Sequence, residues 1–251
     1  LEKKKMDLML KRKQSKNTSK VLFSSNENEQ LERTKEKLKK IKNNTTDLRI
    51  RVTETISKEF LKLSYEVKIK VLNAADFGVP QKRERVIIIG ALEGYSINYP
   101  EPYFIENSQK NKMDLFKSNL SKWITVKESI DDLKNISENH SINHIFTKCG
   151  EEFKKKIKRT PVGKSVYGGF SDAYFRCPPD QPSRTVKENH GGVFIHYEKD
   201  RFMTPRELAR LQSFEDDFIF DGTKSQILVQ IGNAVPPKLG YNIANSLKQN
   251  L

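Results

Sequence analysis

The sequence predicts an α/β fold, in which part of a helix-flanked sheet is joined to a small, β-rich region. The run Val86–Ile89 is entirely apolar and ends at Gly90, which is typical of a strand buried on both faces of such a sheet. Thr204 begins a capping-box pattern that predicts the start of a helix. Residues 94–200 hold most of the prolines, together with short apolar runs such as Val193–Ile195 that favour small strands.

Composition limits the classes of partner. A chain of 251 residues suffices for one large domain or two small ones. Its net charge of +14 favours a polyanion, with nucleic acid first and an anionic membrane second. No apolar run approaches the roughly 20 residues of a membrane helix, and no signal-peptide pattern is present. We therefore expect a soluble, cytoplasmic, prokaryotic protein with no membrane partner; because Leu1 opens the sequence, we also expect a truncated or processed product.

Residues 1–50 form a distinct basic segment. They carry 15 Lys and Arg against 7 Asp and Glu, a net charge of +8. The stretch Ser15–Glu29 is rich in Ser, Asn and Lys, so we expect a flexible, solvated tail. The alternative is an arm that binds phosphates without sequence preference, which requires only charge.

The elements that follow alternate between helix and strand patterns. Apolar residues at helical spacing predict an amphipathic helix over 52–63. Tyr65–Leu72 alternates polar and apolar residues like a strand, and Asn73–Arg83 is predicted to be a loop. Beyond the irregular region, Pro205 stands at the first position of the helix that Thr204 caps, and this helix is predicted to run to Gln212.

Two further helices are predicted near the end of the chain. The first spans Ser225–Ile231 and is expected to stop at Gly232. Pro236 and Pro237 open the second, which carries Leu239, Ile243 and Leu247 on one face.

Gln81, Arg83 and Arg85 alternate at the entry to the apolar run. This alternation predicts that all three side chains point to the same side. Two guanidinium groups beside an amide suit a phosphate, or a base edge that carries acceptors. An exposed basic strand end is the plainer alternative, but open sheets place their ligands near strand ends and in the adjoining loops.

The turn Gly232–Pro237 combines several properties of a binding site. Glycine permits close backbone approach, Asn233 offers donors and an acceptor, and the prolines start a helix whose free N–H groups suit an anion. A tight helix-to-helix turn is the alternative. In the helix that Thr204 caps, Glu207 and Arg210 are spaced to pair, so we interpret Arg206, Glu207 and Arg210 mainly as scaffold.

Three strings together closely resemble the C-terminal motifs VIII, IX and X of the DNA (cytosine-5) methyltransferases. In order, they are Gly78–Arg85, Arg201–Phe214 and Gly232–Pro237. The resemblance covers about residues 52–93 and 183–250, and it places a variable target-recognition region between motifs VIII and IX. It implies an α/β fold made of the C-terminal portion of a Rossmann-like methyltransferase sheet plus a small, β-rich target-recognition domain.

The resemblance also implies a division into domains. After the basic segment 1–50, residues 51–93 would be the C-terminal part of the catalytic domain and 94–200 the target-recognition domain. Residues 201–224 would be the motif IX helix and a linker, and 225–251 the motif X helices that pack back on the catalytic domain.

In such enzymes a cysteine thiolate attacks C6 of a cytosine that is flipped out of the duplex, and C5 then takes a methyl group from S-adenosylmethionine. The resemblance implies that Arg85 contacts the flipped cytosine, and that Gln81 and Arg83 help to hold the base and its backbone. It also implies that part of motif X borders the S-adenosylmethionine site, namely Asn233, Ala234 and Val235.

The sequence departs from the family at the nucleophile. The Phe-x-Gly-x-Gly, Pro-Cys-Gln and Glu-Asn-Val motifs of the family are absent from it, and neither Cys149 nor Cys177 stands in the context of the nucleophile. We expect no metal site, because Cys177 is distant from His140, His144 and Cys149 and the cysteines form no CxxC pair.

Recognition of duplex DNA is expected between motifs VIII and IX. The strongly basic stretch Lys154–Arg159 leads into the glycine-rich stretch Pro161–Phe170, which suits a loop that approaches a phosphate backbone and a groove. Ser171, Asp172, Tyr174 and Arg176 are expected to reach base edges. The full set of predicted DNA-binding residues is Lys164, Ser165, Tyr167, Tyr174, Arg176 and Arg184. The alternative is a small lobe whose lysines face water.

These observations predict the C-terminal part or subunit of a DNA (cytosine-5) methyltransferase, inactive as this chain alone. A second chain would supply the nucleophile and complete the S-adenosylmethionine site. Two alternatives remain: an inactive remnant of a one-chain enzyme, and a non-enzymatic, sequence-specific DNA-binding module. An incomplete sheet would leave an unpaired hydrophobic edge, so the split enzyme predicts weak DNA binding alone and a large gain on assembly.

Overall fold

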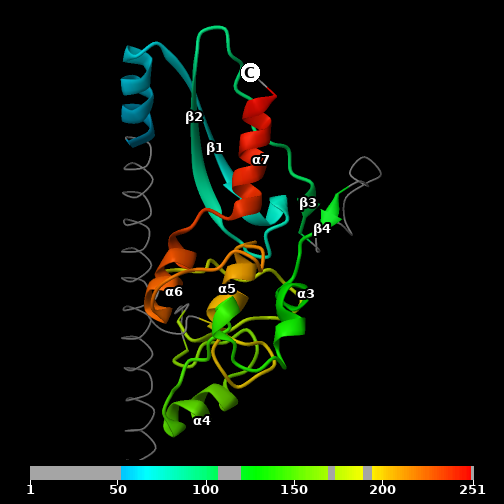
Figure 1. The fold of residues 1–251 in the computed structure, drawn as a ribbon. Coiled ribbons are helices and arrows are strands. Elements are labelled where there is room, and N and C mark those ends of the chain that lie inside the picture. Colours follow the sequence, from blue (N-terminus) through cyan, green and yellow to red (C-terminus); the bar gives the residue numbers. More distant parts are fainter. Residues whose placement is uncertain (1–51, 107–119, 169–172, 189–193, 250–251) are drawn as a thin grey trace, which may run out of the picture. The chain divides into compact units, whose positions relative to one another are not determined.

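The computed structural model describes residues 52–106, 120–168, 173–188 and 194–249 (Figure 1). The chain divides into two compact units, Leu1–Tyr65 and Glu66–Leu251. The predicted flexible tail at 1–50 lies outside the described residues, and so do Ser171 and Asp172.

The described part of the first unit is a helix at residues 52–62, which confirms the helix predicted over 52–63. Phe60 and Tyr65 make an edge-to-face contact just after it, with ring centroids 5.8 Å apart. Leu61 and Leu63 are exposed.

The second unit opens with a two-stranded sheet of β1 (Tyr65–Asn73) and β2 (Glu84–Leu92). The connection contains a short 3-10 helix, η1 (Ala74–Phe77). Asn73 organises this turn, because its side-chain oxygen accepts hydrogen bonds from Ala75 N (3.3 Å) and Arg83 N (3.2 Å). Gly78 ends η1 with a φ of 74°, in the left-handed region that favours glycine.

The prediction that Val86–Ile89 is buried on both faces is wrong for this chain. The strand alternates: Val86 is 53% exposed, whereas Ile87 packs into a core cluster with Leu72 of β1 and Leu239 of α7. One face of the hairpin is therefore covered, and α7 lies along it in Figure 1. The other face presents apolar side chains to solvent, namely Ile69, Val71, Val86 and Leu92.

Short elements make up the described part of residues 94–200. Two pairs of two-residue strands are parallel: β3 (Phe104–Ile105) with β4 (Ser121–Lys122), and β5 (Phe175–Arg176) with β6 (Phe194–Ile195). The helical elements are α3 (Val126–Ile130), η3 (Asp131–Leu133), η4 (His140–Ile142) and α4 (Glu151–Arg159). The basic stretch Lys154–Arg159 thus belongs to a helix, which its charge pattern did not predict.

The C-terminal part holds α5 (Pro205–Leu211), α6 (Lys224–Asn233) and α7 (Pro237–Lys248). Both bonds of the capping box predicted at Thr204 are present, so this helix start is confirmed. The predicted stop of α6 at Gly232 is wrong, because the helix continues to Asn233 and ends at an extended Ala234.

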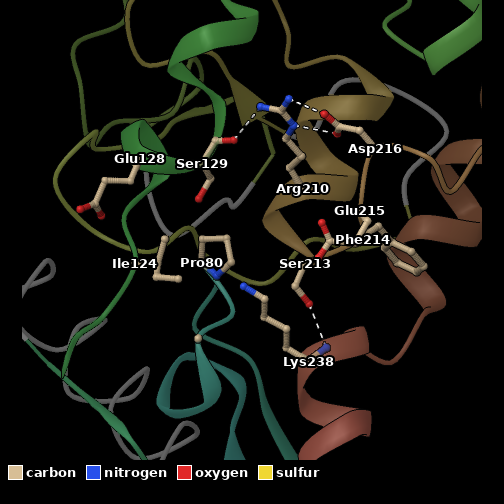
Figure 2. Close-up of a pocket in the computed structure, with 11 residues that line it drawn as sticks. Pro80, Ile124, Glu128, Ser129, Arg210, Ser213, Phe214, Glu215, Asp216 and Lys238 are labelled. Carbon is tan, nitrogen blue, oxygen red and sulfur yellow. Dashed lines mark hydrogen bonds and ion pairs between the residues drawn. The ribbon is translucent and has the colours of Figure 1, made fainter. Parts of the chain in front are cut away.

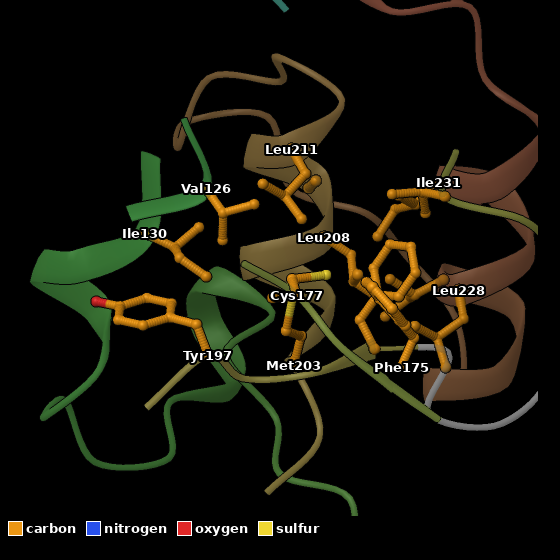
Figure 3. Packing of buried hydrophobic residues seen from close by; sticks show 14 of the residues in the cluster. Val126, Ile130, Phe175, Cys177, Tyr197, Met203, Leu208, Leu211, Leu228 and Ile231 are labelled. Carbon is orange, nitrogen blue, oxygen red and sulfur yellow. The ribbon is translucent and has the colours of Figure 1, made fainter. Parts of the chain in front are cut away.

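The largest hydrophobic core joins the region before Arg201 to the helices after it. Figure 3 shows Val126 and Ile130 of α3 and Phe175 of β5 packed with Leu208 of α5 and Ile231 of α6. The predicted recognition region and the motif IX and X helices therefore share one core. None of the described helices is long and apolar enough to cross a membrane.

Candidate functional site

Gln81 and Arg83 lie at a buried junction of four chain segments. Gln81 is fully buried: its Nε2 donates to Leu211 O (3.1 Å) at the end of α5, and its Oε1 accepts from Val186 N (3.0 Å). Arg83 Nη1 lies 3.4 Å from the same Oε1. The amide thus connects the β2 entry, the Val186 segment and α5.

The guanidinium group of Arg83 completes this junction. It donates to the carbonyl oxygens of Val186 (2.9 Å), Gly232 (3.0 Å) and Ala234 (3.1 Å). Burial, with a further contribution from the nearby charge of Arg85, lowers the pKa of Arg83 to about 10, so the group stays charged at neutral pH. No carboxylate pairs with it in the described part of the chain, and carbonyl dipoles solvate the cation instead.

Arg85 differs from these two side chains in exposure, although its charge is near enough to Arg83 to affect the pKa of that group. It is exposed, and its Nη1 donates to the carbonyl of its neighbour Glu84 (2.6 Å). The prediction that Gln81, Arg83 and Arg85 share one side is therefore wrong. The strand begins only at Glu84, so the two-residue alternation does not extend back to Gln81.

The motif X residues follow directly from the Arg83 junction. Asn233 and Val235 are exposed, and Ala234 between them is partly buried. Gly232 is buried, and a Cβ atom at this position would lie 2.3 Å from Glu188 N and 2.4 Å from Lys187 C. The expected close backbone approach is present, and it lets Arg83 reach the end of α6.

A cavity of about 390 Å³ opens beside this junction, between α3, α5 and the start of α7 (Figure 2). Arg210 lines one side and is fully engaged: it bonds to Asp216 (2.6 and 2.9 Å), Asp132 (2.6 Å) and Ser129 O (3.2 Å). The predicted Glu207–Arg210 pair is therefore wrong.

Lys238 lines the same cavity and was not singled out from the sequence. Its backbone N–H donates to Ser213 Oγ (3.2 Å), and its side chain extends toward Pro80 in Figure 2. A lysine in the first turn of a helix opposes the helix dipole. A lysine directly after the two prolines of motif X is therefore in an electrostatically unfavourable position. This sequence feature could have identified Lys238 as a candidate site residue.

Helix α5 carries a buried polar network that agrees with its interpretation as scaffold. Arg206 is fully buried and donates to the carbonyls of Ile142 (2.7 Å), Glu215 (2.9 Å) and Phe218 (2.7 Å). Glu207 is also fully buried and accepts two bonds from Arg201 (2.7 and 2.8 Å).

Two histidines border this network. Backbone N–H groups of Glu198 and Lys199 donate to His196 Nδ1 (both 3.1 Å), while the buried Nε2 has no hydrogen-bond partner. Burial lowers the pKa of His196 to about 4, against the opposing effect of Glu207. Burial also lowers the pKa of His144, whose Nδ1 lies 3.0 Å from Thr204 Oγ1.

We therefore expect the free energy of unfolding to fall by about 2 kcal/mol between pH 7.5 and pH 5 because of His196. Its folded pKa lies below the ordinary 6.5, so its contribution is complete above pH 6.5 and is lost as the pH falls toward 4. Urea unfolding of the chain at the two pH values measures this loss. In His196→Asn the loss should shrink by about the same amount, and an unchanged pH dependence would contradict the assignment.

The predicted DNA-binding residues differ in accessibility. Lys164, Tyr167 and Arg184 are exposed, and the Arg184 guanidinium stacks on Phe175, 3.8 Å from the ring centroid. Ser165 and Tyr174 are partly buried; Ser165 Oγ donates to Ala173 O (2.6 Å).

Arg176 lies inside the protein, contrary to the expectation that it reaches a base edge. It is 5% exposed and donates to the carbonyls of Ile157 (2.7 Å), Thr160 (2.8 Å) and His196 (3.0 Å). It also pairs with Asp200 (2.8 Å). These partners occupy the guanidinium group, so Arg176 fastens α4 to the loop after β6.

Neither cysteine has the environment of a nucleophile. Cys177 is fully buried in the largest core, and burial raises the pKa of its thiol far above its usual range. Cys149 is partly buried and packs beside Ile157 and Phe202. Within the described ranges, no group of three or more His, Cys, Asp or Glu side chains is arranged to hold a metal ion.

Comparison with known proteins supports what these motifs suggest. The profile of the C-5 cytosine-specific DNA methylases matches residues 36–249 and so begins inside the basic N-terminal segment. Type II methyltransferase M1.HphI of Haemophilus parahaemolyticus is 40% identical over 203 residues, which are 78% of this chain and 51% of that protein. M.NgoFVII of Neisseria gonorrhoeae, also a type II methyltransferase, is 34% identical over 77% of this chain and 53% of its own length.

The fold also has a counterpart among solved structures. A prophage-encoded DNA modification methyltransferase from E. coli superimposes with a TM-score of 0.58 at 20% identity, over 78% of this chain and 64% of that one. The mixed α/β arrangement is therefore part of a Rossmann-like methyltransferase fold. This chain spans about half the length of the curated relatives named above. With motifs VIII, IX and X assembled around Arg83 and the family profile matched over 36–249, the chain belongs to the C-5 cytosine-specific DNA methylase family.

Proposed function

We propose that this chain is the C-terminal part or subunit of a DNA (cytosine-5) methyltransferase. The assembled enzyme methylates C5 of a cytosine in a specific duplex sequence with S-adenosylmethionine as donor. The nucleophile and most of the cofactor site come from a second chain that carries the N-terminal motifs. This chain supplies target recognition, an arginine beside the flipped base and one wall of the cofactor site.

The main observation that supports this proposal is the uncovered apolar face of the β1–β2 hairpin. Ile69, Val71, Val86 and Leu92 are between 37% and 58% exposed on it, while the opposite face is covered by α7. An uncovered apolar sheet face of this kind marks an interaction surface. The remaining half of the methyltransferase fold is the occupant that fits, because the relatives contain about twice the length matched here.

The geometry divides the motif VIII residues between two roles. Arg85 is exposed at the start of β2 and bonds only to the carbonyl of Glu84, so most of its guanidinium donors are available for acceptor atoms on the edge of a flipped cytosine. Gln81 and Arg83 are buried and bond to backbone groups of three other segments. We infer that these two residues position Arg85 and motif X rather than contact the base.

Motif X fits the proposed wall of the cofactor site. Asn233 is exposed at the end of α6, and Val235, 63% exposed, follows it before α7 begins. A side-chain amide next to a small apolar surface suits the polar and aliphatic parts of S-adenosylmethionine, with Ala234 between them. When bound, S-adenosylmethionine supplies the methyl group.

DNA contacts are proposed for the exposed members of the predicted set. Lys164, Tyr167 and Arg184 are accessible, and Ser165 and Tyr174 lie beside them at the surface of the same lobe. Arg176 is the exception, because its hydrogen bonds are satisfied inside the protein.

The test is transfer of labelled methyl groups from S-adenosylmethionine to mixed-sequence duplex DNA. The chain is assayed alone and together with a separately expressed polypeptide that carries the N-terminal motifs of a close relative or of an adjacent reading frame. Transfer only in the mixture is the expected result. Transfer by this chain alone would contradict the proposal, and complex formation without transfer would favour a remnant.

Within the active mixture, Arg85→Ala should lower the methylation rate by about 100-fold or more, because an arginine directed at the reacting base stabilises developing charge. The melting temperature should stay unchanged, since the side chain is exposed and bonds only to its neighbour's carbonyl. Lys248→Ala is the control for loss of an exposed cation that has no proposed contact with the base or the DNA. Equal rates for the Arg85 variant and the unchanged chain would remove Arg85 from the site.

A further inference from the structure

Helix α4 (Glu151–Arg159) has two faces of opposite character. Ile157 is fully buried and Phe153 packs beside it, against Ile195, Phe202 and Tyr174. These two residues are four positions apart and define the inward face. Successive residues of a helix turn by about 100°, so Lys155, Lys158 and Arg159 point away from that face.

Most of the outward charge has no compensating carboxylate. The helix carries five cations and two carboxylates. Glu151 pairs with Lys154 (2.6 Å) and Glu152 pairs with Lys155 (2.9 Å), both as exposed pairs three residues apart. For Lys158 and Arg159, no ion pair is recorded within the described part of the chain, although both are exposed. Exposed lysine pairs are weak, so Lys155 also remains available to another anion.

The segment after α4 adds polar and aromatic side chains beside the flank of the helix. Lys164 is exposed, and Tyr167 is 63% exposed with Lys156 Nζ 5.7 Å from its ring centroid. The backbone turns sharply here, because Gly163 and Gly168 have φ values of 78° and 71°. Arg176 holds this arrangement in place through its bonds to the carbonyls at the end of α4.

The position of α4 determines what such a surface can contact. Figure 1 shows α5 and α6 between α4 and the β1–β2 hairpin, so α4 lies apart from the strand that carries Arg85. A nine-residue helix is about 13 Å long, which corresponds to roughly four base pairs along a duplex.

We propose that the outward face of α4, formed by Lys155, Lys158 and Arg159, binds the phosphate backbone of the duplex to one side of the methylated cytosine. The contact positions the DNA and reads no bases, because exposed cations on long side chains, held at most by a weak surface ion pair, bind phosphates mainly through their charge. The proposal rests on the proposed function in one respect, namely that duplex DNA is the polyanion. Cations in the last turn also favour the helix dipole, but this does not account for Lys155 in the middle of the helix.

The experiment compares the full 251-residue chain with the variant Lys155→Gln, Lys158→Gln, Arg159→Gln. Binding to several 30-base-pair duplexes of unrelated sequence is measured by fluorescence anisotropy between 50 and 200 mM salt. Each lost phosphate contact lowers the slope of log affinity against log salt by about 0.9, so the slope should fall by about 2 to 3. Affinity near 100 mM salt should fall by about 10- to 100-fold, equally for all duplexes.

A second variant controls for net charge and for the basic N-terminal segment. Lys122→Gln, Lys127→Gln, Lys248→Gln removes the same charge from exposed positions on β4, α3 and α7. For this control variant, the slope of log affinity against log salt should change by less than half of the change in the α4 variant. Equal losses in the two variants would overturn the proposal, because they would show an effect of total charge alone. Melting temperatures of both variants establish that each is folded.

Two further readouts separate this inference from the proposed function. If the α4 variant loses more DNA affinity for some duplex sequences than for others, the helix reads bases, which contradicts a contact with the backbone alone. Binding of this chain to anionic vesicles but not to DNA would overturn the α4 contact with DNA; the proposed function is not tested by it, because the split enzyme already predicts weak DNA binding by this chain alone. If methyl transfer never occurs in the mixture but the α4 variant loses DNA affinity as described, the function fails and the phosphate contact stands. If methyl transfer occurs and the α4 variant keeps the salt slope, only the α4 contact fails.

Discussion

Replacing Arg83 with alanine is expected to lower the free energy of unfolding by about 3–5 kcal/mol. The side chain is 4% exposed, and its removal would leave the carbonyls of Val186, Gly232 and Ala234 without their donor. It would also leave a cavity at the point where four segments meet. Urea or thermal unfolding of the full chain measures the effect.

Arg83→Lys separates loss of charge from loss of geometry. Lysine keeps the charge but cannot direct two nitrogen atoms to three carbonyls as a planar guanidinium does, so we expect only partial rescue. Arg85→Ala is the matched control, because Arg85 is exposed and its removal should change stability by less than about 0.5 kcal/mol. Equal stability of Arg83→Ala and Arg85→Ala would contradict the structural role of Arg83. If Arg83→Ala does not fold at all, Arg83→Lys still tests the prediction.

Gly232→Ala is expected to destabilise the fold by about 3 kcal/mol, at the upper end of overpacking effects. The new Cβ would lie 2.3 Å from Glu188 N, 2.4 Å from Lys187 C and 2.6 Å from Glu188 Cα, all of them backbone atoms. Backbone cannot rotate away as a side chain can, so the Lys187 segment or α6 must move. Because Arg83 bonds to Gly232 O, the same displacement should weaken the Arg83 junction.

Gly240→Ala provides a matched control in the neighbouring helix. Gly240 lies within α7, and its nearest neighbour to a new Cβ is Val235 Cγ1 at 4.0 Å. Alanine is favoured over glycine in a helix by about 1 kcal/mol, so this variant should be as stable as the unchanged chain or more stable. Chemical denaturation of both variants gives the comparison. A Gly232 variant as stable as the Gly240 variant would show that the close approach is not required.

The two junction residues and Arg85 differ in what their polar groups contact. Gln81 and Arg83 bond inside the protein, where they connect α5, the Val186 segment and the end of α6. Of these three residues, only Arg85 faces solvent. A loss of activity on changing Arg83 would therefore be accompanied by a loss of stability, whereas a loss on changing Arg85 would not. Measuring both quantities for both variants distinguishes a positioning residue from a contact residue.

The sequence determined the family and most of the local elements. Three motifs in the correct order identified the methylases, and the family profile that matches residues 36–249 confirms this family. The helix start at Thr204 and the start of α7 at Pro237 were predicted correctly, because capping and proline geometry depend on neighbouring residues alone. The strand at 65–72 was also predicted correctly within one residue, because its alternating pattern is local.

Only the tertiary structure decided which polar residues are buried and which apolar residues are exposed. Arg176 and Arg85 look equivalent in the sequence, yet the first is enclosed by carbonyls of α4 and the second is open to solvent. Val86 and Ile87 look alike, yet only Ile87 is covered, because α7 packs on one face of the hairpin. Burial depends on contacts between segments as far apart as Arg83 and Gly232, and no local pattern encodes such a contact.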